Sequence, residues 1–343
     1  MVKKAAQTST RGIPIRERAF AMSNIIGVNA YHVRLDALKR RLIEGGYDSH
    51  ETPHFLVCCR PEPSTAPGAS MLLVHWFAPD AIDSNLGHYL MEELKPLGLL
   101  ANAQQYGEVI GAVVNSVAPR NPEQAWHLFA TNTLRGLRDL IASEQPAPDW
   151  SFPMAVFAAL YRRVYDLCAG ESLLDAGCSS GFLPLMMAEL LPSLTHVVGI
   201  DIYADPFAVA RMIAREKHLV NVQFIQADLL SDDMALLPAF DTVTLLHVLE
   251  HFSDSAIYGV LANLLKLTAR RLIIAVPFEE GEPEPAYGHE QLFTREKLEA
   301  VGNWCIEQWG NGTMRYEDCA GGLLWVERMG RDQTHRVFPA LPG

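Results

Sequence analysis

The chain has 343 residues, of which 49% are hydrophobic and 20% are charged, and its formal net charge is -12 at pH 7. This length suits about two domains. The acidic balance, with only short basic clusters, argues against a nucleic-acid substrate. Because no segment is long and apolar enough to span a bilayer and the N-terminus has no apolar signal core, we expect a cytoplasmic protein without a membrane partner.

Residues 1–150 are predicted to form a mainly helical cap or substrate-specificity region. The segment 1–25 shows little periodicity. The spacing of apolar residues predicts helices over 31–44, 84–95, 104–117 and 122–143. Two short β-like runs, 54–60 and 71–77, flank a Pro/Ser/Gly loop and can pair as a hairpin. The stretch 145–149, Gln-Pro-Ala-Pro-Asp, has the composition of a linker into the second half.

Residues 151–330 alternate between strand and helix signals. Strands are predicted at 172–176, 196–201, 222–226, 240–246, 271–276, near 305–309 and at 322–327. A helix over 153–168 precedes them, and further helices fall between the first five strands. This alternation predicts an α/β fold with a seven-stranded, doubly wound, mostly parallel sheet that ends in an antiparallel hairpin. Residues 331–343 are expected to be a C-terminal tail.

The six cysteines give no sign of a metal site or a redox motif. Only Cys58 and Cys59 are adjacent, and neither a C-x-x-C pair nor a Cys/His metal spacing occurs. We therefore expect reduced thiols.

The segment from Asp175 to Gly181, Asp-Ala-Gly-Cys-Ser-Ser-Gly, follows a buried strand and leads directly into a helix. Doubly wound sheets bind nucleotides where strand ends open into helix N-termini. Gly177 would permit a tight turn and a close backbone approach, although an ordinary strand-to-helix turn has the same pattern. Asp201 ends the next strand 26 positions after Asp175, where a ribose-binding carboxylate belongs. By itself, Asp201 could also be a turn residue.

These two segments and a third, Phe224-Ile-Gln-Ala-Asp228-Leu229, resemble motifs of the class I S-adenosylmethionine-dependent methyltransferases, over about residues 150–328. The resemblance implies a Rossmann-like fold and the cofactor S-adenosyl-L-methionine. It implies that Asp175 meets the cofactor's ammonium group, Asp201 the ribose hydroxyls and Asp228 the adenine amino group. The full cofactor-binding set is Asp175, Gly177, Ser179, Gly181, Asp201, Ile202, Asp228, Leu229 and His247. Ser179 replaces the middle glycine of the family's motif.

The fourth strand of this half ends in His247-Val-Leu-Glu-His251. A Leu-Glu-His ending is similar to family members that methylate small molecules, often at oxygen. The Asn/Asp-Pro-Pro-aromatic motif of the enzymes that methylate nitrogen in nucleic acids is absent here. His247 is a candidate catalytic residue as well as a cofactor contact, since it is expected at the strand end, where the sulfonium and the acceptor would meet. His251 is either a candidate base or a brace for the following helix.

The loop after the fifth strand carries Tyr287-Gly-His289 behind an acidic, Pro-rich stretch. It leaves the carboxyl end of the sheet and can shape an acceptor pocket. A histidine is the natural base for a hydroxyl acceptor, so His289 is our first candidate base and His251 the second. Alternatively, Gly288-His289 only orders the loop. The loop glutamates could also bind a metal with His289, but we expect a solvated loop and no metal; these are Glu279, Glu280, Glu282 and Glu284.

The N-terminal half has no motif with an assigned chemistry. Tyr161 and Tyr165, one helical turn apart, are candidate substrate contacts together with Tyr287 and His289. The two helical tyrosines could instead be core aromatics.

The sequence therefore predicts an S-adenosylmethionine-dependent methyltransferase that methylates a hydroxyl of a small molecule. The N-terminal helices and the Tyr-Gly-His-x-x-x-Phe loop also resemble mycofactocin oligosaccharide methyltransferases, which would make the acceptor a sugar hydroxyl. Two alternatives stay open: S- or N-methylation of a small metabolite, and a non-catalytic cofactor-binding partner subunit. The expected partner is the small-molecule acceptor, with no nucleic acid and no membrane, and a homodimer is left open.

Overall fold

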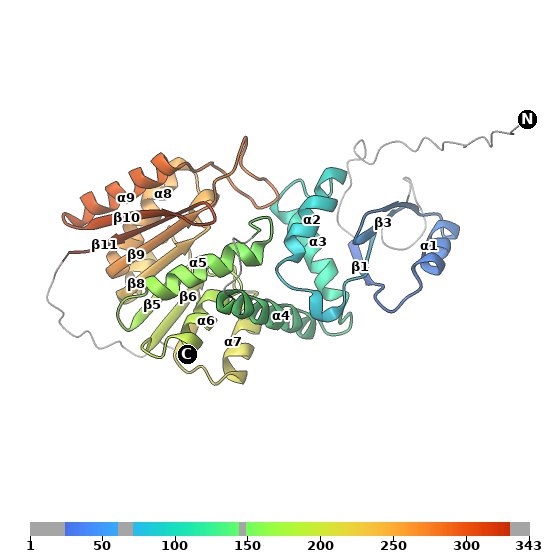
Figure 1. Ribbon diagram of the computed structural model, residues 1–343, viewed down its shortest axis with the longest axis horizontal. Helices are drawn as coiled ribbons and strands as arrows, with labels where there is room; N and C mark the ends of the chain where they lie inside the picture. Colours follow the sequence, from blue (N-terminus) through green and yellow to red (C-terminus); the bar gives the residue numbers. More distant parts are fainter. Residues whose placement is uncertain (1–24, 61–70, 144–148, 330–343) are drawn as a thin grey trace, which may run out of the picture.

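The computed structural model describes residues 25–60, 71–143 and 149–329. The predictions for residues 1–24, for most of the linker and for the C-terminal tail lie outside these ranges. Figure 1 shows three parts along the long axis: a small sheet with one helix, a central group of helices, and a larger α/β unit. Among the described residues, no helix is long and apolar enough to cross a membrane.

The N-terminal region combines helices with a four-stranded sheet in the order β1-β4-β3-β2. Its strands are β1 (Ile25–Asn29), β2 (Asp48–Glu51), β3 (Phe55–Cys59) and β4 (Met71–His75). The predicted hairpin is confirmed, since β3 and β4 pair antiparallel. The outer strands β1 and β2 were not predicted. All four β2 residues are exposed and polar, so β2 lacks the alternation that reveals a half-buried strand.

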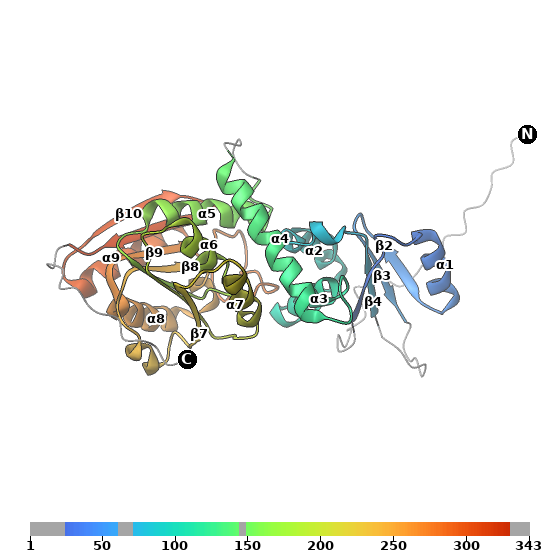
Figure 2. The ribbon, with the colours of Figure 1, turned by 90° about the horizontal axis from the view of Figure 1, so that it is seen from below.

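The helices of this region are confirmed close to their predicted bounds. They are α1 (Leu35–Glu44), α2 (Leu86–Glu93), α3 (Ala103–Asn115) and α4 (Pro122–Ala142), with the 3-10 turns η2 (Pro79–Ala81) and η3 (Lys95–Leu97). Asn102 and Asn121 cap α3 and α4 through their side chains. The long helix α4 runs between the central helices and the α/β unit (Figure 2).

The C-terminal half contains the predicted seven-stranded sheet, in the order β10-β11-β9-β8-β5-β6-β7. The strands are β5 (Ser172–Ala176), β6 (His196–Asp201), β7 (Val222–Gln226), β8 (Phe240–Leu246), β9 (Thr268–Val276), β10 (Thr313–Asp318) and β11 (Gly322–Glu327). The helices are α5 (Pro153–Leu167), α6 (Phe182–Leu190), α7 (Phe207–Glu216), α8 (Asp254–Leu267) and α9 (Arg295–Trp309), with the 3-10 turns η4 (Asp232–Leu236) and η5 (Leu249–His251). Strands β5 to β9 pair in parallel, and β10 and β11 form the predicted antiparallel ending.

The strand predicted near 305–309 is wrong. Those residues are the last turn of α9, and the strand is β10, four residues further along. Cys305 faces the core and Trp309, one helical turn later, packs against the same cluster, so the apolar spacing fits a helix as well as a strand. Gly310, with φ +74, ends the helix in the left-handed conformation.

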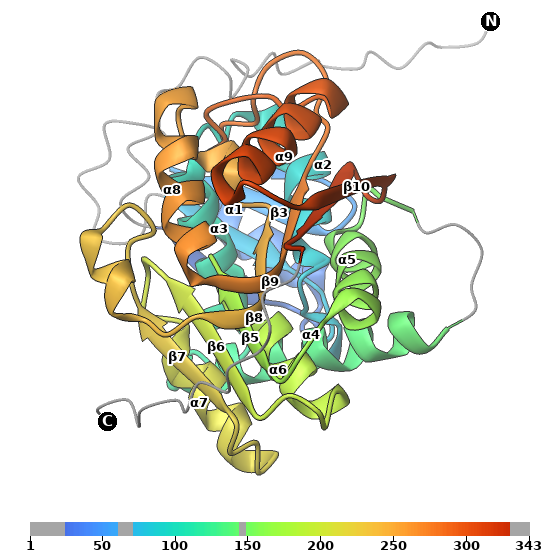
Figure 3. The same ribbon diagram turned by 90° about the vertical axis from the view of Figure 1, so that its left-hand side faces the viewer.

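Two cores cover the two faces of the large sheet. Leu173 of β5 packs with α5, α6 and α7, whereas its neighbour Leu174 packs with α8 and α9. Figure 3 shows these helix groups on opposite sides of the strands. All five residues of β5 are buried, as expected for a central parallel strand. The carboxyl ends of β5, β6 and β8 therefore lie at one edge between the two helix layers.

Candidate active site

The turn between β5 and α6 has the backbone that the glycine motif requires. Gly177 and Gly181 have φ of +77 and +74, and Ser179 takes φ +48 in place of a glycine. A Cβ on Gly177 would lie 2.5 Å from Val248 Cγ2. The glycine therefore lets this turn approach the loop that follows β8.

Asp201 is fixed at the end of β6 by two backbone hydrogen bonds. The amide of Ser179 donates to Oδ2 at 2.8 Å, and the amide of Tyr203 donates to Oδ1 at 3.0 Å. Beside it, Ile202 is 53% and Tyr203 73% exposed. An ordered carboxylate next to exposed apolar side chains suits a nucleoside, which offers two ribose hydroxyls to the carboxylate and a flat base to the apolar side chains.

Asp228 follows β7 and is exposed, with Oδ1 accepting a hydrogen bond from the amide of Leu230 at 2.9 Å. The side chain of Leu229 belongs to the core, so Leu229 can offer only its main chain to a ligand. Leu230 is exposed instead. The sequence does not show which of these two leucines is exposed, because the fold of this turn decides which side chain faces the core.

Asp175 lies buried at the end of β5. Thr244 of β8 donates a hydrogen bond to its Oδ1 at 2.7 Å. Burial raises the pKa of Asp175 to about 7; the hydrogen bond from Thr244 opposes this shift and the charge of Asp201 adds to it. A neighbouring cation would favour the ionised form, so this carboxyl group is suited to receive an ammonium ion.

The two candidate tyrosines of α5 differ in position. Tyr161 is buried, and its pKa is raised first by burial and then by the charge of Asp175, which lies nearby. Tyr165 is 39% exposed, and none of the contacts described above involves it. The α5 residue that faces the loop after β8 is Phe157, whose ring lies 5.5 Å from that of His247.

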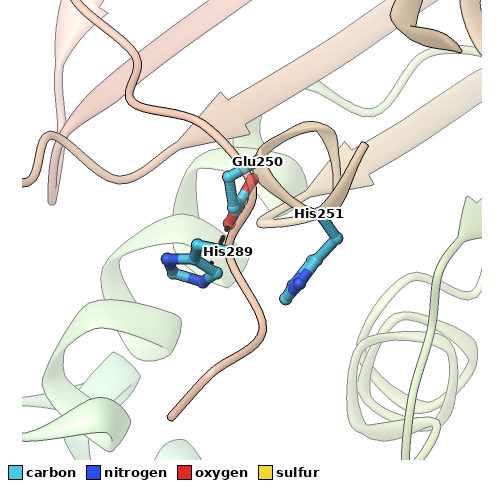
Figure 4. A group of neighbouring side chains, drawn as sticks. All are labelled: Glu250, His251 and His289. Carbon is cyan, nitrogen blue, oxygen red and sulfur yellow. Dashed lines mark ion pairs between the residues drawn. The ribbon is translucent and has the colours of Figure 1, made fainter. Parts of the chain in front are cut away.

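Four side chains gather behind the end of β8, and we call them the His–Glu cluster: His247, Glu250, His251 and His289. Glu250 Oε1 lies 4.0 Å from both His247 Nδ1 and His289 Nε2. The rings of His251 and His289 are 4.9 Å apart. Figure 4 shows Glu250 directed toward His289, with His251 alongside. The structure thus brings together all three predicted catalytic histidines.

Glu250 is the member that sequence reasoning left without a role. Its side chain is 1% exposed, and neither carboxylate oxygen has a hydrogen-bond partner among the described residues. Burial raises the pKa of Glu250 to about 8, with the charge of Glu279 adding to the shift. The Leu-Glu-His segment gives no sign of this burial in the sequence, and a glutamate is rarely buried without a partner.

Two imidazoles of the cluster are oriented through Nδ1. His289 Nδ1 lies 2.8 Å from Glu279 Oε1, and His251 Nδ1 lies 3.2 Å from the carbonyl oxygen of Gly288. Both acceptors favour a proton on Nδ1, which leaves Nε2 as the lone-pair atom. One ligand atom each from Glu250, His251 and His289 lie within 4.8 Å of one another, so these three could hold a metal ion.

His247 differs from the other histidines of the cluster. Its φ is +53, and burial, followed by the charges of His289 and His251, lowers its pKa to about 3. It is therefore neutral at physiological pH and forms part of the wall rather than a strong base. Burial also lowers the pKa of His251.

The N-terminal region contacts the loop that carries His289. Tyr106 of α3 and Tyr287 pack edge to face at 5.4 Å, and Lys95 forms an ion pair with Glu284. Ala286 is fully buried within the N-terminal core. The cap and the candidate acceptor loop are therefore packed together.

A separate cleft of about 610 Å³ lies between α4 and the starts of α6 and α7. Its lining is largely apolar and includes Trp126, Phe129, Phe182 and Val209. None of the predicted site residues lines it.

The model of a family described as "Methyltransferase domain" matches residues 173–270. The ubiquinone biosynthesis O-methyltransferase of Serratia proteamaculans is 37% identical over 97 residues, which cover 28% of this chain and 39% of that protein. The enzyme of the same name from Pseudomonas paraeruginosa is 39% identical over 89 residues, covering 26% and 36%. The chain thus spans well under half the length of these curated relatives.

Solved structures give a looser likeness. An O-methyltransferase family protein from Burkholderia thailandensis has a TM-score of 0.41 and 16% identity, covering 70% of this chain and 82% of that one. The magnesium protoporphyrin IX methyltransferase of Synechocystis PCC 6803 with bound SAM has a TM-score of 0.39 and 20% identity, covering 57% and 90%. The family match runs from β5 into β9, and it includes the glycine turn and the carboxyl ends of β6 and β8.

Proposed function

We propose that this protein transfers a methyl group from S-adenosylmethionine to a hydroxyl group of a small molecule. The observation that carries this proposal is the position of the His–Glu cluster, at the same sheet edge as Asp175 and Asp201. The curated relatives support oxygen as the methylated atom, since their names describe O-methyltransferases. When bound, the cofactor supplies an electrophilic methyl group on a sulfonium.

On the cofactor side, each contact is proposed from the geometry of a strand end. Asp201 would accept the ribose hydroxyls, because both of its oxygens are already fixed by backbone amides. Ile202 and Tyr203 would pack on the adenine, with Asp228 at its amino group. Asp175 would face the ammonium group, with Tyr161 packed nearby.

On the acceptor side, His289 Nε2 is the atom that we propose to take the hydroxyl proton in the metal-free protein. Glu279 holds the opposite ring nitrogen, which fixes the tautomer and stabilises the charged imidazolium, as a carboxylate does in other base–carboxylate pairs. His251 is the second candidate. A general base of this kind contributes about 10²–10⁴-fold to the rate, and the remainder comes from holding the acceptor in line in a dry pocket.

The acceptor's size and shape would be set where the cap meets the loop. Phe157, Tyr106 and Tyr287 place aromatic rings around the cluster. Aromatic rings pack well against flat or ring-shaped molecules, so both phenols and sugars belong in the test panel. A sugar acceptor remains a prediction from the resemblance described above.

The test is methyl transfer from labelled cofactor to matched phenol, sugar, thiol and amine acceptors, and then to a metabolite extract. We expect label on oxygen, with kcat at least about 100-fold lower in His289→Ala and the cofactor affinity preserved. If thiols or amines are the acceptors and both His289→Ala and His251→Ala leave turnover unchanged, S- or N-methylation replaces this proposal. Tight cofactor binding without transfer to any molecule in the extract would instead indicate a non-catalytic subunit.

A further inference from the structure

Glu250 is a buried carboxylate without a hydrogen bond, and three imidazoles surround it. Its side chain is 1% exposed, and neither of its oxygens has a hydrogen-bond partner among the described residues. A carboxylate buried in this way is costly unless a cation or several donors compensate for it. Of the loop glutamates, Glu280 and Glu282 are exposed to solvent and carry no such requirement. No described residue therefore compensates Glu250 with a hydrogen bond, and its two ion-pair neighbours, His247 and His289, lie 4.0 Å away.

The neighbouring histidines are oriented to supply ligands to a cation. His289 Nδ1 is held by Glu279 at 2.8 Å, and His251 Nδ1 by the Gly288 carbonyl at 3.2 Å. Histidine ligands of metals characteristically donate the other ring N–H to a carboxylate or a backbone carbonyl, which fixes the ring and the tautomer. Because Nδ1 is engaged in both rings, Nε2 is the atom that each histidine can offer to a metal ion.

The spacing of the donor atoms is compatible with a single ion. One donor atom from each of Glu250, His251 and His289 lie within 4.8 Å of one another, and Glu250 Oε1 is 4.0 Å from His289 Nε2. Ligand atoms bound to one ion at about 2.1 Å lie roughly 3 to 4 Å apart, so a small inward movement closes the site. Figure 4 shows the three side chains coming from two chain segments that meet behind β8.

Hydrogen bonds to backbone carbonyl oxygens already hold these two segments together. The amide of Glu290 donates to the carbonyl oxygen of Glu250 at 2.8 Å, and the side chain of Gln291 donates to the carbonyl of Leu249 at 3.2 Å. His251 is exposed, which leaves a path for an ion to enter. The arrangement is thus preformed and accessible, as a metal site must be.

We propose that Glu250, His251 and His289 bind a divalent first-row metal ion, with Glu279 orienting His289 through the opposite ring nitrogen. Two imidazoles and one carboxylate, with remaining positions open, form the donor set of catalytic zinc sites, and Mn²⁺ and Co²⁺ accept the same donors. This set differs from the one that the sequence offered, which was His289 with the loop glutamates. From the sequence, no metal was expected.

For its catalytic consequence, this inference rests on the proposed function, because the ion would then replace His289 as the group that promotes loss of the hydroxyl proton. A bound cation lowers the pKa of a hydroxyl. The proton would pass to solvent water, the oxygen would form its bond to the methyl carbon, and the carbon–sulfur bond would break with its electron pair left on sulfur. Metal binding itself does not depend on this step.

The experiment is a titration of the full-length, chelator-treated protein with ZnCl₂, followed by calorimetry, and then with CoCl₂, followed by visible absorption. We expect one Zn²⁺ per chain and a Co²⁺ spectrum typical of nitrogen and oxygen ligands. Glu250→Gln keeps the side-chain volume and removes the charge, so it should abolish this binding. Glu279→Gln should weaken it by about 10- to 100-fold. Glu282→Gln, at an exposed position of the same loop, is the matched control and should bind normally.

A second measurement distinguishes a ligand from a merely structural residue. Without metal, Glu250→Gln should melt at the same temperature as the wild type or higher, because an amide of the same volume replaces a carboxyl group that has no hydrogen-bond partner among the described residues. Added Zn²⁺ should raise the melting temperature of the wild type and of Glu282→Gln, but not that of Glu250→Gln. Equal Zn²⁺ binding by Glu250→Gln and the wild type would overturn the inference, as would the absence of binding by a wild-type protein that binds S-adenosylmethionine and transfers methyl groups. Zn²⁺ binding at this site without methyl transfer to any hydroxyl would overturn the proposed function and leave the metal site standing.

Discussion

The acidic side chains at the ends of β6 and β8 differ in the hydrogen bonds that they accept. At the end of β6, both oxygens of Asp201 accept backbone amides. Behind β8, Glu250 is buried with neither oxygen bonded to a described residue. Asp201 is thus held by the protein's own backbone before any ligand binds. Glu250 has no such hydrogen bonds, and the partner that we propose for it is a metal ion. We therefore expect the proposed cofactor side to be ordered before a ligand binds and the proposed acceptor side to be completed by what it binds.

The largest effect is expected from Asp201→Ala. It removes the proposed acceptor of two ribose hydroxyls, and hydrogen bonds to a charged group contribute about 1.5–3 kcal/mol each. The affinity for S-adenosylmethionine should therefore fall at least about 100-fold, measured by calorimetry, with the fold intact by circular dichroism. Asp205→Ala, at an exposed position of the following turn, is the control. Unaltered binding by Asp201→Ala would remove the basis for regarding the β6 end as the ribose site.

The second effect concerns pH and separates Asp175 from the histidines. Burial raises the folded-state pKa of Asp175 to about 7, so the group is protonated below this value and ionised above it. Binding of an ammonium group requires the ionised form, and the affinity for cofactor should therefore rise about tenfold per pH unit up to pH 7 and then level off. Burial lowers the pKa of His247 to about 3, so this group stays neutral in that window.

Asp175→Asn provides the check on this assignment. Its affinity for cofactor should be low and nearly constant between about pH 5.5 and pH 7.5, because the titrating group is gone. The same pKa shift implies that the fold of the wild type, without cofactor, loses stability as pH rises from the unfolded pKa toward 7, since the buried carboxyl group must then ionise. A steep pH dependence that persists in Asp175→Asn would assign the titration to another group.

Much of the C-terminal half could be predicted because its signals are local. The strands β5, β6, β7 and β8 are short apolar runs between turn residues, and their predicted bounds agree with the structure residue for residue. The polar edge strand β2 has no such pattern, and the apolar run at 305–309 fits two periodicities. Glu250 could not be interpreted from sequence because its importance comes from burial and from His289, 39 positions away in the chain.

Gly177 lets the glycine turn pack closely against the loop after β8. A Cβ there would lie 2.5 Å from Val248 Cγ2, in a backbone with φ +77. Gly281 has a similar φ of +84, but a Cβ on Gly281 would meet nothing within 4 Å, so Gly281→Ala tests the backbone penalty alone. We expect about 1 kcal/mol of destabilisation for Gly281→Ala and about 1–3 kcal/mol more for Gly177→Ala, measured by urea unfolding. Equal losses would mean that the two loops are not in tight contact.

The smallest effect is expected where the cap meets the acceptor loop. Lys95 and Glu284 form an ion pair whose side chains are 42% and 16% exposed, and pairs of this kind contribute at most about 1 kcal/mol. Lys95→Met should therefore raise KM for the acceptor by no more than about fivefold and leave cofactor affinity unchanged. The difference from wild type should shrink at high salt. Lys39→Met, which breaks a pair with Glu51 inside the N-terminal region, is the matched control and should change neither quantity. Because Ala286 already anchors this loop in the N-terminal core, a loss of turnover in Lys95→Met as large as that in His289→Ala would show that charge, rather than apolar packing, holds the cap against the acceptor side.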